Sequence, residues 1–96
     1  MSDTLVLDPI LDLKAAAPLQ ATLLARRGQA VELDASAVQR LGGLCLQVLL
    51  SAHRTWLEDG ASLTFAARSE AFDNALRQFG AHSRLDLQSH DPSGVK

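Results

Sequence analysis

The sequence predicts an α/β fold in which helices pack mainly on one face of a mixed sheet of four to five strands. Short apolar segments typical of strands alternate along the chain with longer segments of helical periodicity, in the order ββαβαβα. Each strand–helix–strand crossover in such a chain is expected to be right-handed. The 96 residues, of which 47% are hydrophobic, suffice for a single domain, residues 1–96, with one modest core.

The N-terminal part is predicted to form a β-hairpin and a helix. Residues 4–7 and 10–13 have the composition of strands, and the Asp8-Pro9 dipeptide between them favours a turn. A helix is expected to begin at Pro18, whose missing N–H costs nothing in a first helical turn, and to end before Gly28. The apolar stripe of this helix would consist of Leu19, Leu23 and Leu24.

The rest of the chain is predicted to alternate strands and helices. The strongest helical pattern runs from residue 44 to residue 58 and includes Trp56 as a core or edge anchor. Ser69 is expected to cap a last helix that ends at Gly80. The buried face of that last helix would consist of Phe72, Ala75, Leu76 and Phe79. The remaining elements are strands at 30–33 and 61–66, an optional strand at 85–87 and a flexible tail at 88–96.

Composition and charge exclude several classes of function. Nine Lys and Arg against eleven Asp and Glu give a net charge of −2, so the basic excess of a general nucleic-acid binder is missing. No apolar segment approaches the ~20 residues that span a bilayer, and the first residues do not have the pattern of a secretory signal. A cytoplasmic protein without membrane insertion is therefore expected.

The chemistry-bearing residues do not suggest catalysis or a cofactor. Cys45 is the only cysteine, which excludes an intrachain disulfide, and its place on an apolar stripe favours a structural role. The acidic residues are spread singly, and His53, His82 and His90 lack the spacing of metal ligands. We expect a protein that is not an enzyme and holds no metal.

The most informative segment is residues 31–50. A strand ends in Asp34-Ala35-Ser36, a small-residue turn contains Gly42-Gly43, and a helix follows with the sequence Cys-Leu-Gln-Val-Leu-Leu. This pattern resembles the STAS family, the fold of bacterial anti-sigma-factor antagonists, and in particular the short STAS proteins found among bacterial chemotaxis components. The resemblance covers about residues 4–80. It implies a STAS fold and a protein partner, namely a regulatory kinase, an anti-sigma factor or a chemotaxis component.

The resemblance also implies where the partner would bind. The surface would be the turn from Asp34 to Leu44 with the start of the next helix, and its residues would be Asp34, Ser36, Gly42, Gly43, Leu44 and Gln47. In STAS proteins this turn usually carries a Ser or Thr that a partner kinase phosphorylates. That position falls at Leu44 or Gly43, and neither has a hydroxyl. Ser36 is the nearest upstream hydroxyl and a weak alternative acceptor, because a hydrogen bond to the backbone at the end of the strand is the simpler explanation for it.

Two other functions stay open. A STAS subunit also accompanies the ATPase of a bacterial lipid-transport ABC complex, where it supports the complex and has no switch of its own. A small nucleotide-binding protein could use the Gly42-Gly43 turn, although the spacing and the Lys of a phosphate-binding loop are missing. Neither the oligomeric state nor the identity of the partner follows from the sequence.

Overall fold

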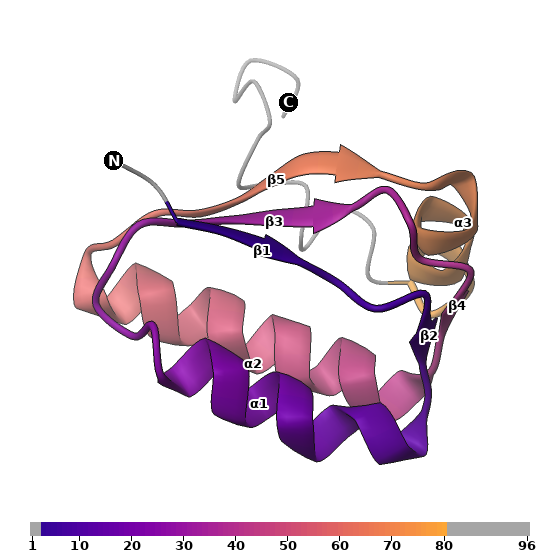
Figure 1. Cartoon of the computed structure of the whole chain (residues 1–96), viewed down its shortest axis with the longest axis horizontal. Coiled ribbons are helices and arrows are strands. Elements are labelled where there is room, and N and C mark those ends of the chain that lie inside the picture. Colours follow the sequence, from indigo (N-terminus) through magenta and orange to yellow (C-terminus); the bar gives the residue numbers. More distant parts are fainter. Residues whose placement is uncertain (1–2, 81–96) are drawn as a thin grey trace.

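The main sheet consists of three parallel strands. The computed structural model describes residues 3–80, and Figure 1 shows the arrangement of their helices and strands. β1 (Asp3–Val6), β3 (Val31–Ala35) and β5 (Leu63–Arg68) lie in the order β1-β3-β5, so β3 is the central strand. Residues of β3 alternate between buried and half-buried positions, as expected for a strand with one face on the core.

The predicted hairpin at the N-terminus is wrong. β2 (Ile10–Leu11) pairs in parallel with β4 (Arg40–Leu41) and not with β1. The cause lies at Pro9, whose carbonyl oxygen accepts hydrogen bonds from the backbone N–H groups of Gln39 (2.7 Å) and Arg40 (3.1 Å). These bonds hold the segment before β4 against the start of β2, so the chain turns into a second, small sheet.

The predicted single mixed sheet is therefore replaced by two parallel sheets among the described strands. The first has the order β1-β3-β5 and the second consists of β2 and β4. The predicted strand at 85–87 and the predicted tail at 88–96 lie outside the described residues. The short strand β4 was not predicted, because two residues are too few to produce a recognisable alternation.

Two of the three α-helices in residues 3–80 cover one face of the main sheet. α1 (Ala16–Leu24) and α2 (Gly43–Asp59) lie next to each other beneath it, whereas α3 (Glu70–Gln78) packs at its end beside β4 (Figure 1). α2 differs from the predicted range by one residue at each end. α2 ends at Gly60, whose φ of 71° is the left-handed conformation that glycine adopts most easily.

The first helix begins earlier than predicted. A short 3₁₀-helix, η1 (Leu13–Ala15), precedes α1, and the carboxylate of Asp12 accepts hydrogen bonds from the backbone N–H groups of Lys14 and Ala15. The Asp12 cap starts the helical segment before Pro18 is reached. Leu24 was also misassigned, because its side chain is 53% exposed while Leu19 and Leu23 are buried.

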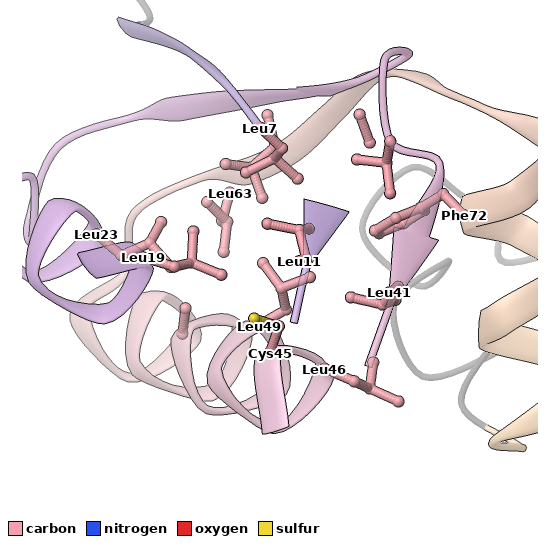
Figure 2. Close-up of a cluster of buried hydrophobic side chains, with 14 of the residues drawn as sticks. Leu7, Leu11, Leu19, Leu23, Leu41, Cys45, Leu46, Leu49, Leu63 and Phe72 are labelled. Carbon is pink, nitrogen blue, oxygen red and sulfur yellow. The ribbon is translucent and has the colours of Figure 1, made fainter. Parts of the chain in front are cut away.

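The core lies between the main sheet, α1, α2 and α3. Figure 2 shows buried side chains from β2, β4, α1, α2 and α3 in one cluster, with Leu49 beside Cys45 and Leu41 on the side of Phe72. Trp56 is 1% exposed, and its indole Nε1–H donates to the backbone oxygen of Gln29 at 2.7 Å, which confirms it as a core anchor. Cys45 is fully buried, and burial raises the pKa of its thiol, as befits a structural residue.

Candidate docking surface

The chain makes a tight turn at the end of β3, where the side chain of Asp34 bonds Ser36. The Asp34 carboxylate accepts a hydrogen bond from the backbone N–H of Ser36 at 2.9 Å and another from the Ser36 hydroxyl at 2.6 Å. These bonds, the hydroxyl bond first, lower the pKa of Asp34 below its usual value. The sequence suggested that the Ser36 hydroxyl bonds the backbone, but it bonds this carboxylate instead.

Ser69 holds the same turn from the other side. Its backbone N–H donates to the carbonyl oxygen of Ala35 at 3.0 Å, and its hydroxyl donates to that of Val38 at 2.5 Å. The hydroxyl oxygen also accepts from the backbone N–H of Phe72, which confirms Ser69 as the cap of α3. The capping role was visible in the sequence. The contact with the turn was not, because it joins residues 31 positions apart.

The chain from residue 34 to residue 44 is anchored at intervals and exposed between the anchors. Ala35, Val38 and Leu41 are buried in the core. The residues between these anchors, namely Ser36, Ala37, Gln39 and Arg40, are exposed. The segment therefore has a defined path and still presents backbone and polar side chains to solvent.

Gly42 is the N-cap of α2, and its backbone lies close to the backbone of β2. Its backbone N–H donates to the carbonyl oxygen of Leu11 at 2.9 Å, and a Cβ at Gly42 would lie 3.3 Å from that same oxygen. No side chain caps α2, and its first turn contains no acidic residue. The first N–H groups of α2 consequently give this end of the helix an uncompensated positive partial charge.

An exposed apolar patch lies beside this helix start. Leu44 is 49% exposed, and Phe79, at the end of α3, is 51% exposed. Two carbon atoms of the Phe79 ring lie 3.7 and 3.8 Å from the position that a Cβ on Gly43 would take. We call Gly43, Leu44 and Phe79 the α2-start patch. Phe79 was predicted to be in the core. It is instead a surface residue that sequence reasoning missed, because α3 has already ended when the chain reaches it.

The six residues predicted from the sequence fall into two groups. Asp34 and Ser36 bond each other at the end of β3, whereas Gly42, Gly43, Leu44 and Gln47 lie at the start of α2. Gln47 is exposed one turn after Gly43. The buried side chains of Val38 and Leu41 anchor the chain between the two groups.

The described part of the chain gives little support for a phosphate-binding or metal-binding site at the start of α2. The N–H of Gly42, which a phosphate cradle would need, is donated to Leu11. Within residues 3–80 there is no group of three His, Cys, Asp or Glu side chains that could hold a metal ion, and His53 is half-buried on α2. None of the helices among these residues is both long enough and apolar enough to span a bilayer.

Comparison with known proteins adds one finding. A family model with the description "Mlab, STAS domain" matches residues 1–89. No curated protein and no solved structure matches the chain. The matched range contains the turn after β3, the start of α2 and all six residues predicted from the sequence. The chain therefore belongs to the STAS domain family.

Proposed function

We propose that this protein is a non-enzymatic STAS module that binds another protein through the start of α2 and the turn after β3. The residues at the centre of this surface are those of the α2-start patch, with Gln47 on α2 and Asp34 and Ser36 on the turn. The partner class is a regulatory kinase, an anti-sigma factor or a chemotaxis component in the cytoplasm of a bacterium. The family membership supports a role in signalling by binding.

The observation that carries the proposal is the exposure of two large apolar side chains at one helix start. Leu44 and Phe79 each keep about half of their surface in solvent. A few such apolar anchors contribute most of the free energy of a typical protein interface. The turn beside them is held by Ser69 and Asp34, so little conformational entropy is lost when a partner docks.

We further propose that phosphorylation at this helix start does not control the binding. Neither Gly43 nor Leu44 has an oxygen that could accept a phosphoryl group. The Ser36 hydroxyl lies 2.6 Å from the Asp34 carboxylate. A phosphoryl group on Ser36 would place ~1.5–2 negative charges against that carboxylate, which is unfavourable. Mass spectrometry after incubation with a cognate kinase checks this point, and phosphate on Ser36 would contradict it.

The test of the docking surface is the exchange Leu44→Asp. We expect binding to the native partner to fall by at least about tenfold, since an anchor is lost and a charge is placed in the interface. The melting temperature should change little, because an acidic residue in the first turn of α2 interacts favourably with the helix dipole by ~0.3–1 kcal/mol. Surface plasmon resonance and thermal unfolding of the same samples measure the two effects.

Leu57→Asp is the matched control, because Leu57 is an exposed leucine at the other end of the same helix. It should leave partner binding close to that of the wild type. Equal loss of binding in both variants, or no loss in Leu44→Asp, would place the docking surface elsewhere.

A second candidate function keeps the surface and changes the partner. The chain would be the STAS subunit of a lipid-transport ABC complex. The lack of a hydroxyl at residues 43 and 44 favours it, because such a subunit has no switch of its own. Affinity purification from the native host separates the candidates: recovery of a transporter ATPase supports this second function, and recovery of a signalling kinase or anti-sigma factor supports the first.

A further inference from the structure

We propose that the open edge of β1 binds an extended segment of a partner protein, which adds a strand to the main sheet. The segment would be apolar at alternate positions and would carry a basic residue. This second surface is formed by β1 and α1, so it does not depend on the function proposed for the start of α2.

The backbone of β1 has hydrogen-bonding groups that lack a strand partner among the described residues. β1 is the first strand in the order β1-β3-β5, so only one of its edges is paired. The backbone N–H of Leu7 donates toward β3, to the carbonyl oxygen of Asp34 at 2.9 Å. Because residues of a strand alternate in direction, the backbone groups of Thr4 and Val6 are turned to the open edge.

A groove lies along this edge. Its volume is about 200 Å³, and it runs between β1 and α1. Its lining residues are Leu5, Val6, Leu7, Asp8, Leu11, Ala15, Pro18, Leu19 and Thr22. Leu7, Leu11 and Leu19 are buried parts of the core, whereas the Val6 side chain is 62% exposed. A strand added beside β1 would therefore find apolar contacts for every second side chain.

Three of the features that usually keep such strands unpaired are missing from residues 4–7. Soluble proteins protect open edges with lysine, proline or a bulge. The residues from Thr4 to Leu7 contain neither lysine nor proline, and the pairing of β1 with β3 is regular over four residues. The edge of β1 is thus able to accept a strand from a partner.

Charge decides which strand fits. Among the described residues that line the groove, Asp8 is the one with a charged side chain. Residues 1–13 contain three aspartates and neither lysine nor arginine. A second copy that paired through its own β1 would bring like charges together, which is unfavourable. A segment of another protein that carries lysine or arginine opposite Asp8 avoids this repulsion and gains an opposite charge.

A peptide-display experiment on the full chain tests the proposal. A library of random peptides of about 12 residues, long enough to span β1 at ~3.3 Å per residue, is selected on the wild-type protein. We expect enriched peptides to alternate apolar residues and to contain a lysine or arginine. A synthetic copy of one such peptide should shift the NMR signals of the Thr4 and Val6 amides and slow their hydrogen exchange.

Four variants make the result specific. Val6→Pro removes an outward N–H without breaking the pairing with β3 and should weaken peptide binding by about tenfold, whereas Val6→Thr keeps the N–H and should bind like the wild type. Asp8→Lys should weaken the binding of basic peptides and allow acidic peptides to bind. The test therefore does not depend on the Val6→Pro variant alone. Leu44→Asp should leave peptide binding unchanged, which separates this edge from the start of α2.

Several outcomes would overturn the proposal. Peptides that bind Val6→Pro and Asp8→Lys as tightly as the wild type, or a library from which nothing is enriched, would show that the edge does not accept a strand. A wild-type dimer that Val6→Pro converts to a monomer in sedimentation experiments would show that a second copy occupies the edge instead.

Discussion

Ser69 connects the last helix to the turn that carries part of the candidate docking surface. One side chain caps α3 at Phe72 and donates to the carbonyl oxygen of Val38, while its backbone N–H bonds Ala35. The turn after β3 therefore depends on a residue about 30 positions further along the chain. At the scale of single residues, the shape of this surface is determined by hydrogen bonds that cross the fold.

Ser69→Ala should reduce the free energy of unfolding by about 2 kcal/mol. Loss of an N-cap costs ~1 kcal/mol, and the lost bond to Val38 adds a similar amount. Urea unfolding measures the change. Ser36→Ala is the control, since its hydroxyl is exposed and its removal should cost no more than ~0.5 kcal/mol. Equal stability of Ser69→Ala and the wild type would mean that the turn does not need Ser69.

The pKa of Asp34 should report the bond with Ser36. That pKa is lowered in the folded protein, first by the Ser36 hydroxyl and then by the Ser36 backbone N–H. The bond therefore stabilises the fold above the usual pKa of an aspartate, and the stabilisation is lost as the pH falls through the lowered value. In Ser36→Ala the pKa of Asp34 should rise toward its usual value, as measured by NMR titration of the carboxyl carbon. An unchanged pKa of Asp34 in this variant would contradict the hydrogen bond from the Ser36 hydroxyl to its carboxylate.

At the scale of elements, α2 is the part that the sequence predicted best. Its periodicity is local, and Gly60 ends it with a backbone conformation that other residues rarely adopt. The beginning of α2 depends less on the sequence of the helix than on its surroundings. Gly42 lies against the backbone of Leu11, and Gly43 lies beside the ring of Phe79.

Two exchanges of glycine for alanine at the ends of α2 should have opposite effects. Gly43→Ala should stabilise the protein by about 0.5 kcal/mol, because glycine is a poor helix former and the new methyl group fits at ordinary contact distance from Phe79. Gly60→Ala should destabilise it by about 1 kcal/mol, because φ at residue 60 is 71°. Urea unfolding of both variants checks the signs. A change in the free energy of unfolding with the same sign in both variants would contradict the helical backbone assigned to Gly43 or the left-handed backbone assigned to Gly60.

At the scale of the whole molecule, one core joins the two sheets and the three α-helices of the described residues. Trp56 bonds Gln29, which links the end of α2 to the connection between α1 and β3. An ion pair between Arg27 and Asp59 lies at the same end of the molecule, with Nε and Oδ2 2.9 Å apart. These contacts hold the C-terminal end of α2 to the connection between α1 and β3, and because one core joins all of these elements they should unfold as one unit.

The only tryptophan should report this cooperativity. Trp56 fluorescence and far-UV circular dichroism should change in one coincident transition, because Trp56 is buried among the helices and strands. Leu49→Ala should move both transitions together and cost about 3 kcal/mol, whereas Leu24→Ala, at an exposed position, should cost no more than ~0.5 kcal/mol. Separate transitions for the two probes would show that the sheets unfold independently.

The sequence by itself determined what depends on neighbouring residues. Periodicity predicted α2 and α3 closely, the Ser69 cap and the Gly60 end were recognisable, and the segment from Val31 to Leu50 indicated the family. Tertiary structure decided what depends on residues far apart in the chain. The pairing of β2 with β4, the position of Phe79 beside Gly43 and the bonds from Ser69 to the turn all join segments about 30 residues apart or more. Such contacts form only when the whole core assembles, so no local pattern encodes them.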